Sequence, residues 1–119
     1  MNNIIVVIDD CELLKWSLMK ILPHYADTIQ YYDNLLDALQ ALNQAKDTRY
    51  ILIVDLEIAT LSGINTLIKK LAVDRYNLIL LTSMLSAYNE QDIHCQGVVK
   101  IFTKPFNINE LTDLILTLI

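Results

Sequence analysis

Glycine, proline and cysteine are all scarce in this sequence, and each shortage excludes a class of protein. Only two Gly and two Pro occur among the 119 residues, which excludes collagen-like, low-complexity and linker-rich chains. The two cysteines, Cys11 and Cys95, match no CxxC or metal-ligand spacing, so we expect both to be reduced thiols. No apolar run approaches the ~20 residues that a membrane-spanning helix needs. A membrane partner is therefore not expected.

Positive charge is also in short supply. Nine Lys and Arg stand against 14 Asp and Glu, which gives a net charge of −5, and no basic cluster is longer than Lys69-Lys70. Because phosphate backbones are bound by basic surfaces, we do not expect this domain to bind nucleic acid directly. The N-terminus Met1-Asn2-Asn3 lacks the basic region of a signal peptide. The expected compartment is therefore the cytoplasm.

Apolar residues, by contrast, are abundant and make up 54% of the chain. A length of 119 residues suits one domain, because two domains would each be too small to bury a sufficient core. Three aliphatic runs predict strands that are buried on both faces, at 4–8, 50–54 and 77–81. A less buried strand near an edge of the sheet is expected at 27–32, and a further strand at 98–102.

Apolar residues at mostly helical spacing lie between these strands. They predict helices over 11–22, from Asp33 or Asn34 to Leu42, over 64–73 and within 85–94, and a last helix that Asn107 or Asn109 opens and that contains Leu111, Leu114, Ile115 and Leu118. Asp9 or Asp10 is expected to cap the first helix. The segment from Asp55 to Ser62 is expected to form a loop.

A strand followed by a helix is thus repeated five times. Such alternation is typical of βαβ units and of a parallel sheet with helices on both faces. Right-handed crossovers require the helices to change faces, which predicts an α/β fold with a doubly wound five-stranded parallel sheet of order 2-1-3-4-5, the flavodoxin-like (βα)5 arrangement. No glycine-rich phosphate loop follows the first strand, so the nucleotide-binding version of this architecture is not expected.

Polar side chains follow four of the predicted strands, namely Asp9 and Asp10, Asp55, Thr82, and Lys104. In the order 2-1-3-4-5 the first and third strands are neighbours, so three carboxylates converge at the carboxyl edge of the sheet. Like charges this close repel, and a hard divalent cation such as Mg²⁺, assisted by the lysine ammonium, would offset them. A carboxylate, a metal, a lysine and a hydroxyl are the parts needed for phosphoryl transfer onto an aspartate.

These residues, in this order, resemble the motif of the receiver domains of bacterial two-component response regulators. The resemblance covers essentially the whole chain as one domain, residues 1–119. It depends on an acidic pair, an aspartate at the end of the third strand, a glycine eight residues later, a strand-end threonine and a Lys-Pro-Phe sequence, which are Asp9-Asp10, Asp55, Gly63, Thr82 and Lys104-Pro105-Phe106.

The resemblance implies that Asp55 accepts a phosphoryl group from a histidine kinase, a phosphotransfer protein or a small phosphodonor. It implies a Mg²⁺ site in which Asp10, Asp55 and the backbone carbonyl of Glu57 are direct ligands, while Asp9 acts through metal-bound water. The domain would then be a signalling module and not a metabolic enzyme, because its only chemistry is the gain and slow loss of the phosphoryl group at Asp55.

The resemblance also implies how the signal is passed on. Lys104 pairs with Asp55 at rest and with the phosphoryl oxygens afterwards, and the Thr82 hydroxyl moves inward to hydrogen-bond the phosphoryl group. That motion repacks a surface made by the fourth helix, the fifth strand and the fifth helix. Glu57 and Met84 flank the site and are expected to influence the phosphoryl lifetime.

The sequence departs from the family pattern at several positions. Receivers usually carry an aromatic residue three positions before the lysine, where this chain has Ile101. Phe102 follows it, but strand alternation points Phe102 to the other face of the sheet. Ile58-Ala59 stands where Met-Pro is common, and Cys11 stands where the acidic pair is usually followed by another acid.

Three other interpretations stay open. All the polar strand ends could be structural, as helix caps and as a strand exit before proline. The chain could be a receiver-like interaction module that does not switch, given Ile101. It could also be an aspartyl-phosphate phosphatase, although Asp55-Leu56-Glu57 matches the Asp-x-Asp motif of haloacid-dehalogenase-type phosphatases poorly.

The output of such a receiver is expected to pass through another protein surface. The sequence contains no evident DNA-binding or enzymatic segment, so we expect a downstream protein effector or an output domain as partner. Residues 114–119 are apolar on more than one helical face, which suggests a homodimer through the last helix as a hypothesis.

Overall fold

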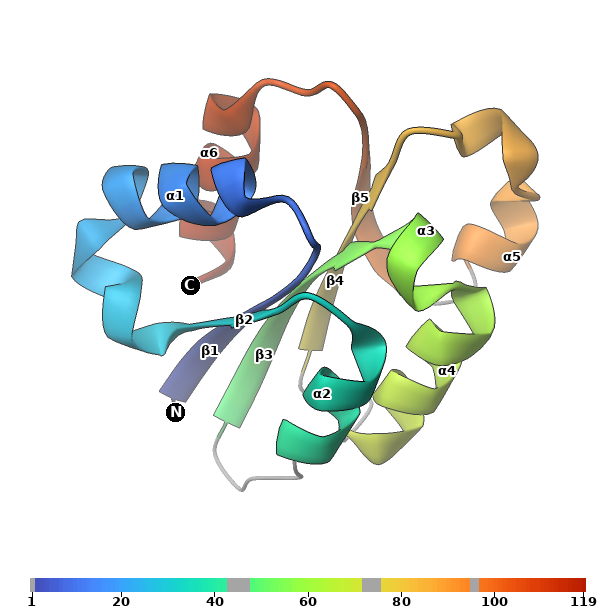
Figure 1. Ribbon diagram of the computed structural model, residues 1–119, viewed down its shortest axis with the longest axis horizontal. Coiled ribbons are helices and arrows are strands. Elements are labelled where there is room, and N and C mark those ends of the chain that lie inside the picture. Colours follow the sequence, from blue (N-terminus) through green and yellow to red (C-terminus); the bar gives the residue numbers. More distant parts are fainter. Residues whose placement is uncertain (1, 43–47, 72–75, 95–96) are drawn as a thin grey trace.

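The computed structural model describes residues 2–42, 48–71, 76–94 and 97–119. Its centre is a five-stranded parallel sheet of order β2-β1-β3-β4-β5 (Figure 1), which confirms the α/β fold and the doubly wound strand order. The strands are β1 (Asn2–Ile8), β2 (Ile29–Tyr32), β3 (Thr48–Asp55), β4 (Tyr76–Thr82) and β5 (Val98–Thr103).

Helices cover both faces of this sheet (Figure 1). One face is covered by α1 and α6, and the other by α2, α4 and α5. The α-helices are α1 (Glu12–Ile21), α2 (Leu35–Ala41), α3 (Leu56–Ala59), α4 (Leu61–Lys70), α5 (Glu90–His94) and α6 (Ile108–Leu118). Two 3₁₀ helices, η1 (Pro23–Thr28) and η3 (Leu85–Ala87), complete the described elements.

The buried apolar residues of strand β3 determine where Asp55 lies. Ile51 and Ile53 pack into the core beneath α1 and α6, whereas Leu52 and Val54 pack into the core beneath α2 and α4. All four side chains are fully buried, and each such burial contributes about 1.5–3 kcal/mol. Since both faces of the strand are covered, the first carboxylate falls where the strand ends, at Asp55.

The helix caps differ in part from the sequence expectation. The residue that precedes α1 is Cys11, whose side chain makes no capping hydrogen bond, so the expected cap by Asp9 or Asp10 is wrong. Asp9 accepts the Cys11 backbone N–H instead, at 2.9 Å, which is too early in the chain to satisfy the first helical turn. For α2 and α6 the capping residues are Asn34 and Asn107.

The expected loop over 55–62 is also wrong, because this segment contains all of α3 and the start of α4. Asp55 begins α3 by accepting the backbone N–H groups of Glu57 and Ile58, at 2.8 and 3.1 Å. Thr60 then caps α4 in the same way. A helix of four residues has too few positions for an apolar period, so the sequence pattern could not reveal it.

Other boundaries shift by a few residues. Strand β2 begins at Ile29 because η1 occupies the preceding positions, and the helix expected within 85–94 is divided into η3 and α5. Helix α4 ends at Lys70; the end of the helix expected there, residues 72–73, and also Cys95 lie outside the described residues. Within the described part of the chain, no helix has the length and apolarity needed to cross a membrane.

Candidate functional site

Three charged side chains meet where the central strands end. Asp9 follows β1, Asp55 ends β3, and Lys104 follows β5. The Lys104 Nζ lies 2.9 Å from Asp9 Oδ2 and 2.6 Å from Asp55 Oδ2. The two carboxylate side chains are only 1% and 7% exposed, against 27% for the lysine. One ammonium therefore offsets two nearly buried negative charges.

The Lys104 ammonium is held in its charged form by these partners. Partial burial by itself would lower its pKa. The hydrogen bonds to Asp55 and Asp9, together with the negative charges of these carboxylates, outweigh burial and raise the Lys104 pKa above its usual value. A fixed positive charge thus lies directly against one oxygen of Asp55.

The other oxygen of Asp55 is held by the backbone. Asp55 Oδ1 accepts both N–H groups at the start of α3, while Oδ2 accepts from Lys104. The carboxylate is therefore fixed in orientation by three donors, and Oδ2 has only the lysine as its partner among the described contacts. A carboxylate that is held in one orientation next to a cation is suited to attack an electrophilic phosphorus.

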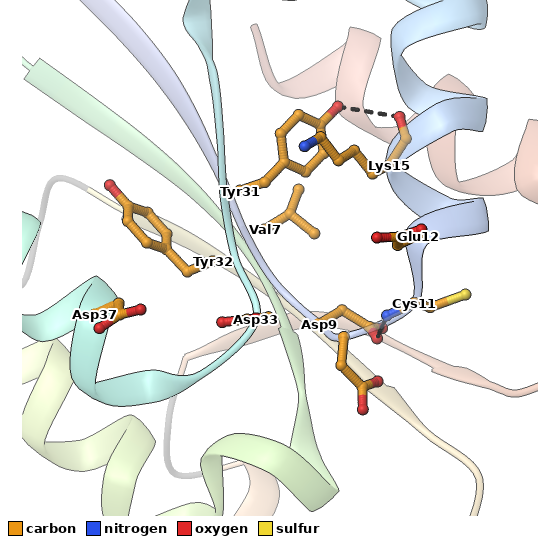
Figure 2. A pocket seen from close by; sticks show the side chains of 10 residues that line it. Val7, Asp9, Cys11, Glu12, Lys15, Tyr31, Tyr32, Asp33 and Asp37 are labelled. Atoms are coloured by element: carbon orange, nitrogen blue, oxygen red, sulfur yellow. Dashed lines mark hydrogen bonds between the residues drawn. The ribbon is translucent and has the colours of Figure 1, made fainter.

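Asp9 and Asp10 have different surroundings. Asp9 is pinned between the Cys11 backbone N–H and Lys104, whereas Asp10 is exposed. Figure 2 shows Asp9 turned toward the Cys11 nitrogen on the loop that leads into α1. The pocket beside it has a volume of about 360 Å³, and its rim is strongly acidic, with Glu12, Asp33 and Asp37 (Figure 2).

The residue types at this edge suit a hard divalent cation, because all the candidate ligands are carboxylate or carbonyl oxygens. Within the described residues, no three acidic, histidine or cysteine side chains are grouped closely enough to hold a metal ion. The reason is visible in the contacts: the lysine ammonium bridges Asp9 and Asp55, and Asp10 is exposed. The donor chemistry therefore fits Mg²⁺, while in the arrangement present one lysine ammonium bridges two of the carboxylates and offsets only part of their charge.

Thr82 lies beside Asp55 but is bonded elsewhere. Residue Leu81 of β4 is the register partner of Asp55, so Thr82 is one step further along the same edge. The hydroxyl of the fully buried Thr82 donates a hydrogen bond to Glu57 Oε2 at 2.6 Å, and its oxygen accepts one from the Met84 N–H at 3.0 Å. The hydroxyl is thus next to the carboxylate site but committed to a different partner.

Sequence reasoning missed the cluster of hydrogen-bond donors that surrounds the Glu57 side chain. Its Oε2 also accepts the Tyr88 hydroxyl at 2.9 Å, and its Oε1 accepts the Ser83 backbone N–H at 2.7 Å and the Ser83 hydroxyl at 3.0 Å. Burial alone would raise the Glu57 pKa, but the bonds from Thr82, Ser83 and Tyr88 outweigh it and lower the pKa. No local pattern could identify contacts between residues 25 to 31 positions apart.

Two further motif positions lie outside the carboxylate cluster. Gly63 is buried in the first turn of α4, where an added Cβ would collide with the Leu35 side chain of α2, so its role is close helix packing. Ile101 packs against the core beneath α2 and α4, and Phe102 is buried on the opposite face, where its ring centroid lies 5.4 Å from that of Phe106. Neither residue at 101 or 102 therefore supplies an aromatic ring to the Ile101 face.

Comparison with known proteins gives a clear result for the fold. No protein-family model matches the chain, and no curated protein matches it. Among solved structures, the HemR receiver domain of Leptospira biflexa has a TM-score of 0.72 and 18% identity, over 98% of this chain and 93% of that one. A CheY-like receiver domain from Methylobacillus flagellatus has a TM-score of 0.72 and 14% identity, over 100% and 99%.

A third solved structure is the receiver domain of the sensor histidine kinase PA1611 from Pseudomonas aeruginosa, with a magnesium ion coordinated in its active-site cleft. Its TM-score is 0.70 and its identity 16%, over 98% of this chain and 97% of that one. The chain therefore has the fold of response regulator receiver domains over nearly its whole length. At these identities the likeness establishes the fold, and the residues of the site must support the function.

Proposed function

We propose that residues 1–119 form a phosphoacceptor receiver domain of a two-component or phosphorelay system, with Asp55 as the acceptor. The observation that supports this most directly is the Asp55 carboxylate, fixed by two backbone N–H groups on one oxygen and by Lys104 at 2.6 Å on the other. A helix cap alone needs only the first of these oxygens. The ion pair at the second oxygen supplies the positive charge that phosphoryl transfer needs.

The proposed step is an in-line displacement at phosphorus. With acetyl phosphate as donor, Asp55 Oδ2 forms a new O–P bond while the P–O bond to the acetyl group breaks, and acetate leaves with the electron pair. The product is an aspartyl phosphate. Lys104 then shifts its hydrogen bond from the carboxylate to a phosphoryl oxygen, which keeps one positive charge at the reacting centre.

We further propose that Asp9, Asp10, Asp55 and the backbone carbonyl of Glu57 hold Mg²⁺. When bound, the metal would neutralise negative charge on the phosphoryl oxygens. Lys104 would bind the phosphoryl group from the side opposite the metal. The buried Thr82 hydroxyl would lie nearby, because Thr82 follows Leu81, the register partner of Asp55.

The proposed partners follow from this chemistry. A histidine kinase or a phosphotransfer protein would donate the phosphoryl group, and a downstream effector or output domain would contact the surface formed by α5, β5 and α6. Leu116 and Ile119 of the C-terminal segment are 46% and 39% exposed, which supports a homodimer through α6 as one form of output.

The test is the intact mass of the protein after incubation with Mg²⁺ and acetyl phosphate. The native chain should gain one phosphoryl group, and Asp55→Asn should gain none. Asp113→Asn, which alters an exposed aspartate on α6, is the matched control and should be labelled like the native chain. If acetyl phosphate and a set of purified phosphorylated histidine phosphotransfer domains all leave the native chain unlabelled, while it still binds Mg²⁺, the proposal fails.

Failure of labelling would favour a receiver-like interaction module. Two observations support that alternative: Thr82 is already hydrogen-bonded to Glu57, and the Ile101 position lacks an aromatic ring. A phosphatase is disfavoured because the second acid of its motif, Glu57, has both oxygens occupied by hydrogen bonds. Turnover of p-nitrophenyl phosphate that is lost in Asp55→Asn would revive it.

A further inference from the structure

The Glu57 side chain connects three elements around the acceptor. It projects from α3, immediately after Asp55, and reaches the end of β4 and the segment that contains η3. Its carboxylate accepts four hydrogen bonds, two on each oxygen, from Thr82, Ser83 and Tyr88. A carboxylate cap on α3 would need none of these contacts, so the arrangement requires another explanation.

The Thr82 hydroxyl has one proton and can donate one hydrogen bond, which Glu57 accepts in this structure. The donor–acceptor distance of 2.6 Å is that of a strong charge-assisted hydrogen bond. The same proton cannot also be donated to a phosphoryl oxygen on Asp55. Any rearrangement that brings Thr82 to the phosphoryl group must therefore break the bond to Glu57.

Building on the proposed phosphoacceptor function, we propose that Glu57 is a positioning residue that holds the Thr82 hydroxyl away from Asp55 in the resting state. Its negative charge, two residues from the acceptor, also opposes phosphoryl transfer to Asp55, so the charge and the hydrogen bond act together. Phosphorylation then has to take the hydroxyl from Glu57, and the resting state is stabilised by the strength of that bond.

We call the hydrogen bond from Thr82 to Glu57 the latch, and Tyr88 connects it to the segment that contains η3. Its hydroxyl donates to Oε2 of Glu57, the same oxygen that accepts from Thr82. Its ring packs against the core beneath α2 and α4, which is also the core that Ile101 contacts. When Thr82 leaves Oε2, the bond to Tyr88 is altered at once, so Tyr88 transmits the change to η3 and α5. The chain thus has an aromatic coupling residue, but on the segment between β4 and α5.

Two substitutions separate the latch from its transmission. Glu57→Gln keeps the side-chain volume but removes the charge, and Glu12→Gln makes the same charge change at an exposed position beside the site without touching Thr82. Tyr88→Phe removes only the hydroxyl and leaves the bond between Glu57 and Thr82 in place. All are compared with the native chain for the rate of phosphoryl uptake from acetyl phosphate.

Loss of one charge-assisted hydrogen bond predicts uptake about 10-fold faster in Glu57→Gln. Glu12→Gln should match the native rate. In Tyr88→Phe the amide NMR shifts of Gln91 to Ile93 should respond less to phosphorylation than in the native chain. A merely structural role for Glu57 would lower stability without accelerating uptake, so an unchanged or slower rate overturns the latch. A native-sized NMR response in Tyr88→Phe overturns the transmission.

A second measurement works without any phosphodonor. The Ser83 N–H donates to Glu57 and the Met84 N–H donates to Thr82, so amide exchange at both should be about 10-fold faster in Glu57→Gln than in Glu12→Gln. Unchanged exchange would overturn the latch. If neither the native chain nor Glu57→Gln is phosphorylated but exchange accelerates, the proposed function has failed, while the hydrogen bonds that join Glu57 to Thr82 and Ser83 are confirmed.

Discussion

The carboxyl edge of the sheet carries two clusters that satisfy negative charge in opposite ways. Around Lys104, one ammonium is shared by two carboxylates that are almost fully buried, so one negative charge remains without its own counter-charge. Around Glu57, one half-buried carboxylate is satisfied by neutral donors only, from Thr82, Ser83 and Tyr88. Loss of the ammonium would leave two buried carboxylates without a counter-charge, which is costly. Loss of one donor to Glu57 would leave three hydrogen bonds in place.

The difference suits a division of labour in the proposed function. A charge that must stay in place through phosphoryl transfer is best held by a buried ionic cluster. A hydroxyl that must change partner is best held by a bond that can be exchanged for a similar bond. Both clusters begin from the same short segment, because Asp55 and Glu57 are two residues apart on either side of the start of α3.

The largest expected effect comes from removing the shared cation. Lys104→Met leaves Asp9 and Asp55 as neighbouring buried carboxylates without a counter-charge, which should lower the free energy of unfolding by about 3 kcal/mol at neutral pH. Urea unfolding at neutral pH measures this effect, and Lys69→Met, at an exposed lysine on α4, is the control.

The cluster around Lys104 is also the part of the site that the sequence could predict. The sheet order follows from the alternation of apolar runs and helical periods, and the placement of Asp9, Asp55 and Lys104 follows from strand ends that meet at one edge. These inferences need only the backbone topology. The expectation that Asp9 or Asp10 caps α1 failed because it depended on a side-chain choice: Asp9 is bonded to Cys11 and Lys104 instead.

The Glu57 cluster could not be predicted for the same physical reason. Its contacts join side chains on α3, at the end of β4, and beyond η3, and none of these positions lies on a periodic face. A Glu and a Tyr separated by 31 residues carry no local signal of contact. The short helix α3 was missed as well, and that helix is what aims Glu57 at β4.

A smaller effect is expected at the second cluster. Glu57→Gln should lower the free energy of unfolding by only about 1 kcal/mol, because Glu57 is half-buried and water can replace its donors. Thermal unfolding of Glu57→Gln beside Lys104→Met provides the comparison. A loss at Glu57 equal to that at Lys104 would mean that both clusters are equally rigid and would remove the proposed division of labour.

The smallest effect is expected for Ser83→Ala. Its hydroxyl bond to Glu57 Oε1 is exposed, and the backbone N–H of the same residue continues to donate to that oxygen. The free energy of unfolding should change by less than about 0.5 kcal/mol. Denaturant midpoints measured beside those of Glu57→Gln would test this, and a change above 1 kcal/mol would show that the side-chain donors act together.

The bridge from Lys104 has a further consequence for how the chain acquires its chemistry. The lysine is 95 residues from Asp9 and 49 from Asp55 along the chain, and its own backbone N–H donates to Thr82 O at 2.8 Å. A growing chain that has passed β3 already contains Asp55, yet this carboxylate has no counter-charge until Lys104, which follows β5, has been made and brought to the same edge of the sheet. Under the proposed function, a chain whose fifth strand has not joined the sheet would therefore hold the acceptor without its cation.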